Sequence, residues 1–305
     1  MGTGFLVSVP SNKPPVFLHA YVVTATHVVQ PYPVTLVRLR VSPSEFVDVP
    51  VPQWEHHHAA DVSVAPLRPV RAKLTRRPIT VTIESERFVG SGDVMGWEPE
   101  LGERVYFLGL FDRFREMGER NIPLTRSGSV AAFYVQDVPI GPPDNLRHVE
   151  AHLIDCRSYA GFSGSPCFVQ RDMWEPSWFA EGGTHVDDES GRIHTETALL
   201  GIVSGHFDTW GTARLTGDLP MEPGAVEVPL NTGVGVVTPA KAIKEMLEMK
   251  ELADDRARVE DETEKRVKGD EGATLDASQE SEFDRFERLT RELVNTPKQT
   301  ESDES

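Results

Sequence analysis

The sequence predicts an all-β fold, either a barrel or a sandwich, over most of its length. Twelve short runs rich in β-branched or aromatic residues alternate with turn residues up to about Val237, without helical periodicity between them. The chain also contains 23 Pro and 24 Gly, which favour turns and short strands over long helices. Closely spaced strands of this kind are typical of antiparallel barrels and sandwiches. A parallel α/β fold and an all-helical fold are therefore not expected.

Each predicted strand is a short apolar or alternating run bounded by turn residues. In chain order the predicted strands are 4–9, 16–23, 34–41, 46–51, 61–67, 79–83, 104–110, 128–135, 148–154, 167–169, 199–204 and 233–237. Residues 170–197 mix tryptophans, glycines and acidic residues between two of these strands, so we expect an inserted surface loop there.

One helix is predicted directly after the strands, over residues 239–249. Thr238 is expected to be its N-cap and Pro239 its first residue. Three apolar side chains recur on one face, which should pack against the β domain: Ile243, Met246 and Leu247.

The C-terminal tail, residues 250–305, has a different composition. It holds 18 Asp or Glu against 10 Lys or Arg. Residues 251–279 are charged and poor in aromatics, which predicts a largely disordered acidic linker. A short amphipathic helix is expected behind Ser281, with four apolar residues at helical spacing: Phe283, Phe286, Leu289 and Leu293. Such a segment docks on the domain, binds a regulatory protein, or frays.

The charge of the chain argues against a nucleic-acid partner. The formal net charge is -17, which repels a nucleic-acid backbone.

Cys156 and Cys167 are too few for a disulfide framework, so we expect two reduced thiols. The N-terminus lacks the pattern of a signal peptide, and the most apolar stretch, residues 16–25, is too short to cross a membrane. These features predict a cytoplasmic protein that binds neither nucleic acid nor membrane.

The hexapeptide from Gly161 to Pro166, which reads GFSGSP, is the most informative motif. A serine between glycines on a tight turn can expose its hydroxyl while neighbouring backbone N–H groups converge on one point. Small residues are needed there because a bulky side chain would fill the space that an acyl oxygen occupies. A plain turn entering a strand would read the same way.

Two upstream residues could activate Ser163. His27 ends an apolar run, and Asp61 directly precedes an alternating strand. A serine hydroxyl is a weak nucleophile near neutral pH, so it needs a base, and the base needs a carboxylate to hold its tautomer. Taken singly, His27 also fits a core histidine and Asp61 a strand cap.

Together these motifs resemble the chymotrypsin-fold, trypsin-like serine peptidases, especially the bacterial branch that includes the HtrA-type proteases. The similar segments are GTGFLV at 2–7, TATH at 24–27, DVSV at 61–64, LGERVYFLG at 101–109, TRSGSVA at 125–131, GFSGSP at 161–166 and LGIVS at 200–204. The resemblance covers residues 2 to 247 in the family's order.

The resemblance implies two antiparallel six-stranded barrels, over about 1–90 and 91–238, with helix 239–249 completing a domain of residues 1–249. Ser163 would be the nucleophile, His27 the general base and Asp61 its orienting carboxylate. The N–H groups of Gly161 and Ser163 would form the oxyanion hole. The segment Ser204, Gly205 and His206 would pair with substrate backbone. No cofactor and no metal are implied.

The sequence departs from the family pattern at several positions. Phe162 replaces the acid that zymogen-activated relatives use, and Ser165 replaces a frequent glycine. No PDZ-like domain follows the barrels. Asp48 is an alternative to Asp61 as the triad carboxylate.

The substrate preference rests on Arg157. Counting back from the serine turn places Arg157 near the base of the primary specificity pocket and His206 near its mouth, which would favour an acidic side chain. Alternatively, Arg157 is a surface residue. The run His56, His57 and His58 does not favour a metal site, because consecutive side chains cannot all face one ion.

We therefore expect a serine endopeptidase that cleaves protein or peptide substrates through an acyl-enzyme intermediate, without a cofactor. The alternative is a catalytically silent relative that binds extended peptides. A latent protease, gated by the tail or by residues 170–197 until a partner binds, is a third hypothesis.

Overall fold

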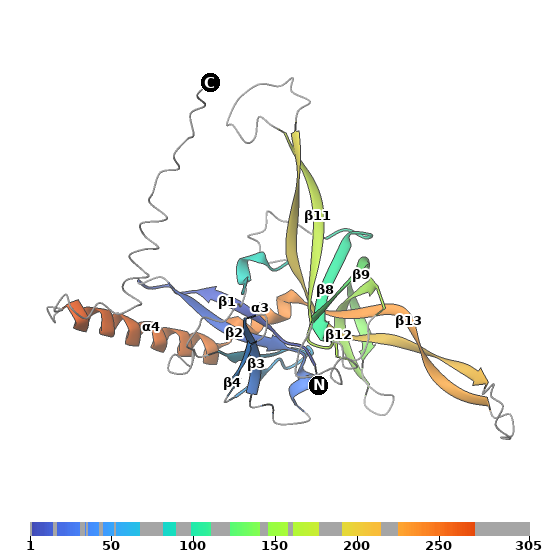
Figure 1. The fold of residues 1–305 in the computed structure, drawn as a ribbon, viewed down its shortest axis with the longest axis horizontal. Coiled ribbons are helices and arrows are strands. Elements are labelled where there is room, and N and C mark those ends of the chain that lie inside the picture. The colour runs from blue at the N-terminus through green and yellow to red at the C-terminus, as the bar shows by residue number, and fades with distance from the viewer. Residues whose placement is uncertain are drawn as a thin grey trace.

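The computed structural model describes residues 2–14, 17–30, 34, 36–42, 45–51, 53–67, 82–89, 99–110, 123–140, 146–157, 161–176, 191–214 and 225–271. Strands make up most of these residues, and two helices follow them at the C-terminal side (Figure 1). The prediction of a mostly β fold is therefore confirmed.

The N-terminal strands form two small sheets. A five-stranded sheet has the order β5-β6-β2-β1-β7, in which β7 runs parallel to β1 and the other neighbours are antiparallel. A separate hairpin pairs β3 with β4. The bounds are β1 Phe5–Pro10, β2 Leu18–Thr24, β3 Leu36–Ser42, β4 Glu45–Pro50, β5 Glu55–His56, β6 Ser63–Pro66 and β7 Ile83–Glu84. The described residues thus contain no closed, wholly antiparallel six-stranded barrel in this half.

Alternation along β1 and β2 supplies two apolar clusters. Leu6 and Val22 pack with Leu39 and Val49 of the β3–β4 hairpin. The intervening residues of β1 and β2 face the opposite side, because successive strand residues point to opposite faces.

The second half is a closed barrel of six strands in the order β10-β13-β12-β11-β8-β9, with every neighbour antiparallel. Its bounds are β8 Arg104–Leu110, β9 Pro123–Ile140, β10 Arg147–Asp155, β11 Pro166–Pro176, β12 Gly191–Arg214 and β13 Ala225–Pro239. Apolar side chains fill its interior, among them Val105, Phe107 and Leu200. The barrel expected for residues 91–238 is present.

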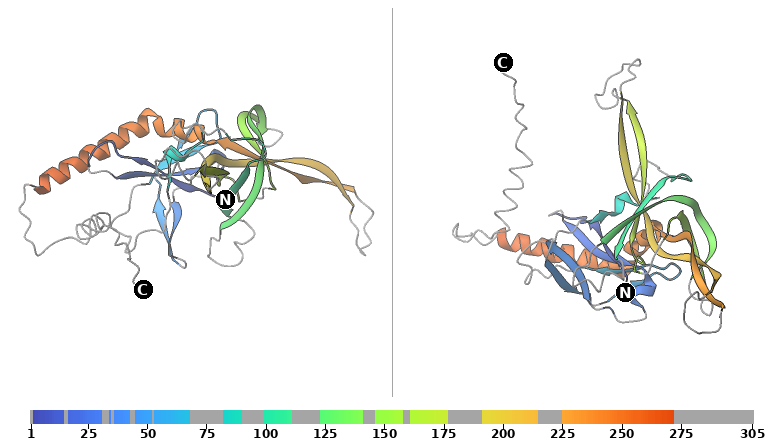
Figure 2. Two further views of the ribbon diagram at one scale, coloured as in Figure 1. Left: turned by 90° about the horizontal axis from the view of Figure 1, so that it is seen from above. Right: turned by 45° about the vertical axis from the view of Figure 1, so that its right-hand side comes forward.

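Two long hairpins extend from this barrel (Figures 1 and 2). In the first, β11 and β12 stay paired out to Pro176 and Gly191, and in the second, β12 and β13 stay paired out to Arg214 and Ala225. The expected surface loop over 170–197 is therefore wrong in part, because its two ends extend the strands. Residues 177–190 lie outside the described part.

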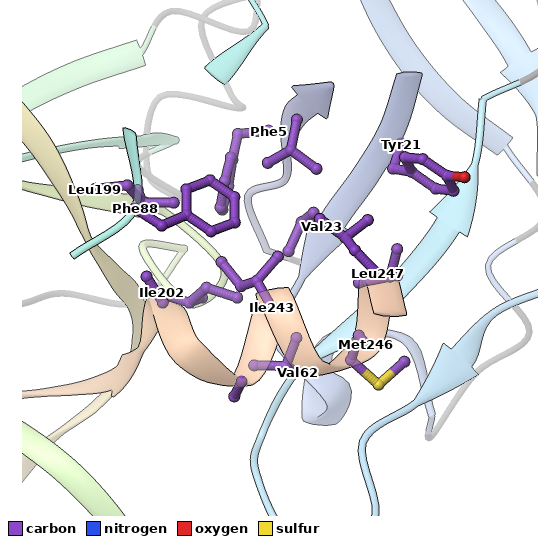
Figure 3. Packing of buried hydrophobic residues seen from close by; sticks show 14 of the residues in the cluster. Phe5, Tyr21, Val23, Val62, Phe88, Leu199, Ile202, Ile243, Met246 and Leu247 are labelled. Atoms are coloured by element: carbon purple, nitrogen blue, oxygen red, sulfur yellow. The ribbon is translucent and has the colours of Figure 1, made fainter. Parts of the chain in front are cut away.

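Helix α3 (Ala240–Glu248) seals the core between the two halves. Ile243, Met246 and Leu247 are buried in one cluster with residues of the N-terminal sheet and of β12 (Figure 3). Phe5, Tyr21 and Val23 contribute from one side, and Leu199 and Ile202 from the other. The predicted helix face is thus confirmed, and one hydrophobic core holds both halves together.

The predicted N-cap of α3 is wrong. Pro239 is the N-cap residue, and no side chain caps the helix. Thr238 is still part of β13, where its hydroxyl is hydrogen-bonded to the Ser204 hydroxyl.

Residues 250–271 form helix α4 (Lys250–Glu271), where the sequence predicted a disordered linker. Among its residues described as buried are Leu252 and Glu260, so polar contacts do much of the docking. The Glu260 carboxylate accepts hydrogen bonds from His19 Nε2 at 3.1 Å and from the Asn12 N–H at 3.1 Å. Arg256 donates to the Tyr21 hydroxyl at 3.1 Å. These partners lie far away in sequence, so local composition could not reveal them.

Residues 272–305, which include the predicted amphipathic helix, lie outside the described part of the chain. No helix in the described part combines the length and the apolarity that a bilayer crossing requires.

Both cysteines are free and buried in the barrel core. Burial raises the pKa of the Cys167 thiol far above its usual range, and burial also raises the pKa of Cys156. Both thiols therefore stay protonated and act as small apolar side chains, as the sequence predicted.

His152 is a buried titratable side chain on β10, 1% exposed. Its Nδ1 accepts the Tyr134 N–H at 3.3 Å, so in the neutral ring the proton is on Nε2, which has no partner among the described residues. Burial disfavours the charged form and lowers the pKa of His152 from 6.5 to about 4.

We expect this histidine to make the fold acid-sensitive. Between pH 6.5 and about 4 the unfolded chain binds a proton that the native His152 does not, so the free energy of unfolding falls as the pH falls. From pH 7 to pH 4 the loss through this group is about 3 kcal/mol.

Chemical denaturation of the wild type and His152→Gln across this range measures the effect. The wild type should lose its advantage over His152→Gln on acidification, whereas His148→Gln, at an exposed position of the same strand, should follow the wild type. A pH-independent difference between the wild type and His152→Gln would contradict the assignment.

Candidate active site

His27 and Asp61 are joined by two hydrogen bonds. His27 lies on the single-turn helix α1 (Thr26–Val29), directly after β2, and Asp61 lies just before β6. The backbone N–H of His27 donates to Asp61 Oδ1 at 3.0 Å, and His27 Nδ1 is 2.7 Å from Asp61 Oδ2. One carboxylate therefore fixes both the backbone and the ring of His27.

This contact sets the tautomer of the imidazole. An ionised carboxylate only accepts hydrogen bonds, so Nδ1 must carry the proton and donate it to Asp61. In the neutral ring Nε2 is then an unprotonated acceptor. Asp61 is 6% exposed and the His27 side chain 46% exposed, so a buried anion orients a base that solvent can reach. Among the described residues, nothing in the protein hydrogen-bonds to Nε2.

The structure pairs His27 with Asp61 and not with the alternative, Asp48. Asp48 lies on β4, where Arg38 donates to both of its carboxylate oxygens at 2.7 and 2.9 Å. The hydrogen bond from Arg38 lowers the pKa of Asp48.

Two of the three consecutive histidines, His56 and His57, support the loop that carries Asp61. His57 Nδ1 accepts the N–H groups of Ala59 and Ala60 at 3.1 and 2.8 Å, so its Nε2–H donates to Glu245 of α3 at 3.0 Å. His56 Nδ1 is 2.7 Å from the Ser63 hydroxyl. Within the described ranges, no three His, Cys, Asp or Glu side chains are grouped to hold a metal ion.

Ser163 lies on a turn that only glycines can complete. Gly161 and Gly164 have φ of +98° and +86°, a region that residues with a Cβ rarely adopt. A Cβ on Gly164 would overlap the Thr3 carbonyl oxygen. The turn is anchored by Phe162, which is buried edge-on against Phe107 with ring centroids 5.4 Å apart.

The turn leaves the Ser163 N–H unoccupied. The Phe162 carbonyl accepts the Ser165 N–H at 2.9 Å, and the two ends of a trans peptide point in opposite directions, so the Ser163 N–H points away from that contact. In the described part of the chain, the N–H groups of Gly161 and Ser163 find no protein acceptor. Two such donors on one turn can bind a developing oxyanion if they point to a common place.

The N-terminal segment brings the serine turn beside the histidine segment. The Thr3 N–H donates to the Ser163 carbonyl at 2.8 Å. A Cβ built on Gly2 would lie 2.5 Å from Val28 Cγ2 and 2.8 Å from the Ser163 carbonyl oxygen. Ser163 and the residue after His27 therefore contact the same small glycine. No hydrogen bond links the Ser163 hydroxyl to His27 Nε2 among the described contacts.

The predicted substrate-binding residues have different environments. Ser204 is buried and its hydroxyl contacts Thr238, so its side chain is not available to a ligand. Gly205 follows a bulge in β12, and a Cβ there would meet nothing within 4 Å. His206 is half-buried and pairs with Asp208 at 3.3 Å. Arg157 is exposed, and its carbonyl accepts from Arg126 Nη2 at 3.3 Å.

Two residues that build this region, Thr3 and His57, leave no signal of that role in the sequence. The GTGFLV segment marked a strand, but nothing in it indicated that the Thr3 side chain reaches the serine turn. The role of His57 depends on Glu245, almost two hundred residues away in sequence, so no local pattern could have shown it.

No protein-family model matches the chain, and no curated protein matches it.

Two glycines test the steric demand of the serine turn. Gly164 and Gly102 share a positive φ, +86° and +84°, but a Cβ on Gly102 would meet nothing within 4 Å. Gly102→Ala should therefore cost about 1 kcal/mol of unfolding free energy, for backbone strain alone. Gly164→Ala should cost about 3 kcal/mol more, since it also overpacks against Thr3. Equal losses in urea denaturation would contradict the tight approach of Thr3 to the turn.

Proposed function

We propose that this chain is a serine endopeptidase that works through Ser163, His27 and Asp61. The observation that carries the proposal is the double hydrogen bond between buried Asp61 and exposed His27, which leaves Nε2 as a base on the side open to solvent. The serine turn, placed beside the histidine segment by Gly2 and Thr3, supplies a hydroxyl and two free amides.

The proposed reaction follows from these groups. His27 Nε2 takes the proton of the Ser163 hydroxyl as its oxygen attacks the scissile carbonyl, and the carbonyl oxygen becomes negatively charged. The N–H groups of Gly161 and Ser163 stabilise that charge. His27 then gives its proton to the leaving amine. In the second half of the reaction His27 takes a proton from a water molecule, which attacks the acyl-enzyme, and returns the proton to the Ser163 oxygen. Asp61 keeps the ring oriented and balances the imidazolium charge.

The Ser163 hydroxyl makes no described hydrogen bond to His27, which would also suit a silent peptide-binding module. In the absence of substrate such hydrogen bonds are often long, so this geometry alone does not favour the rival. A chemical test decides between the two.

Reaction with a fluorophosphonate probe tests the nucleophile. The full-length wild type should be labelled covalently at one residue, identified by mass spectrometry as Ser163, and Ser163→Ala should not be labelled. Labelling should fall by about 10⁴ in Asp61→Asn, because the wrong tautomer of His27 is then held.

Asp48→Asn is the matched control. It removes the same charge from an exposed ion pair, so the labelling rate should stay within twofold of the wild type. A wild type that is not labelled, or a Ser163→Ala variant labelled as fast as the wild type, would favour the peptide-binding alternative.

We further propose that the enzyme prefers an acidic residue before the scissile bond. Arg157 precedes Ser163 by six positions and is exposed, so its guanidinium is available to a substrate carboxylate. His206 contributes less, because its Nε2 already pairs with Asp208 at 3.3 Å.

Cleavage profiling of a proteome digest should therefore show enrichment of Glu and Asp at that position. Arg157→Ala should reduce the preference about tenfold, the size expected for a hydrogen bond to a charged group. Arg147→Ala, at an exposed position of β10, is the control and should leave the profile unchanged. A wild-type profile indifferent to acidic residues would rule the preference out.

The partner proposed for this site is a protein or peptide substrate, acted on in the cytoplasm without a cofactor. A regulatory protein that binds the C-terminal segment and gates the site is a second proposal. A truncation that tests gating should end after Glu271, because α4 packs on β2 through Arg256 and Glu260.

A further inference from the structure

Thr3 connects three parts of the chain through its backbone and its hydroxyl. Its N–H donates to the Ser163 carbonyl at 2.8 Å, and its own carbonyl accepts from the Thr24 hydroxyl at 2.7 Å. Its hydroxyl is 2.8 Å from the Gly161 carbonyl oxygen and 2.9 Å from the Leu110 N–H. Thr3 is only 9% exposed, so these contacts are shielded from water.

The direction of each hydrogen bond follows from the chemistry of the partners. The Leu110 N–H can only donate, so the Thr3 hydroxyl oxygen accepts from it. The Gly161 carbonyl can only accept, so the single hydroxyl proton of Thr3 points to it. The side chain therefore has one arrangement that satisfies both neighbours, and a hydroxyl is the smallest group that can donate and accept at once.

Thr3 thereby holds the serine turn at both ends. Its hydroxyl fixes the carbonyl of Gly161, and its backbone fixes the carbonyl of Ser163. Between them, Phe162 is locked by burial against Phe107 and by the Ser165 N–H. The N–H groups of Gly161 and Ser163 have no acceptor among the described residues.

We propose that Thr3 is a positioning residue for the oxyanion-binding amides of Gly161 and Ser163, an inference that rests on the proposed serine peptidase function. The same residue is tied to Thr24, three positions before His27, so it also sets the serine turn against the strand that carries the base. Thr3 touches no reacting atom itself.

Loss of the hydroxyl would remove the side-chain partner of two partly buried backbone groups. In Thr3→Val the Gly161 carbonyl and the Leu110 N–H lose their hydrogen bonds, while the shape of the side chain and all backbone contacts of residue 3 remain. The peptide between Gly161 and Phe162 is then no longer held. It joins the two peptide units that carry the Gly161 and Ser163 N–H groups, so both donors can shift from their positions. A displacement of about 1 Å in such a group lowers rates by about a hundredfold.

The experiment measures fluorophosphonate labelling of full-length wild type, Thr3→Val, Thr3→Ser and Thr263→Val. The phosphonyl oxygen of the probe occupies the oxyanion position, so the maximal labelling rate reports the amide donors and the half-saturating probe concentration reports initial binding. Thr263 donates its hydroxyl to the Val259 carbonyl within α4 and so controls for the loss of a threonine hydroxyl.

We expect Thr3→Val to lower the maximal rate about tenfold to a hundredfold, with an unchanged half-saturating concentration and an unchanged midpoint of its pH profile. Thr3→Ser should restore most of the rate, and Thr263→Val should label like the wild type. Should Thr3→Val melt below the assay temperature, Thr3→Cys, whose thiol donates weakly, should give an intermediate rate.

A maximal rate for Thr3→Val equal to that of the wild type would overturn the proposal and leave the peptidase function standing. So would a loss that serine does not restore in a variant of equal melting temperature, or a shifted pH midpoint, which would place the defect at His27. Absence of labelling in the wild type itself would instead overturn the proposed function, and the role of Thr3 with it.

Discussion

The apolar core beneath α3 is the constraint on which the remaining structure depends. Ile243 and its neighbours pack at once against the N-terminal sheet and against β12 of the barrel, so two halves that contribute different functional groups cannot shift independently (Figure 3). Burial of a large aliphatic side chain contributes about 2 kcal/mol, and this cluster contains many of them. The Asp61–His27 pair comes from one half and the serine turn from the other, so their mutual position depends on this packing together with the hydrogen bonds of Thr3 to Ser163 and Thr24.

Much of the β architecture could be predicted from the sequence, because strands and turns leave local signals. The run predicted over 104–110 coincides with β8, and the apolar face of α3 was found from its spacing alone. Features that depend on partners distant in sequence could not be predicted. Helix α4 looks like a solvated linker in isolation, since its docking uses His19 and Tyr21 of β2. Threonine is a residue type favoured at N-caps, but the hydroxyl of Thr238 is hydrogen-bonded to the hydroxyl of Ser204.

The candidate site divides in the same way. The three residues of the proposed triad, His27, Asp61 and Ser163, stand in motifs that can be recognised one by one, and the structure joins the first two directly. The choice between Asp61 and Asp48 could not be made from the sequence, because it depends on Arg38 occupying the second carboxylate. The supporting contacts of Thr3 and His57 leave no pattern, since one hydroxyl or imidazole among many is distinguished only by its neighbours in space.

Helix α4 is attached to β2, the strand that leads to His27. Tyr21, which receives the Arg256 hydrogen bond, and His19, which contacts Glu260, lie on the strand whose far end leads into α1 and His27. Separation of α4 from β2 would break these polar contacts. One strand thus connects the residues that contact α4 to His27, which follows its other end.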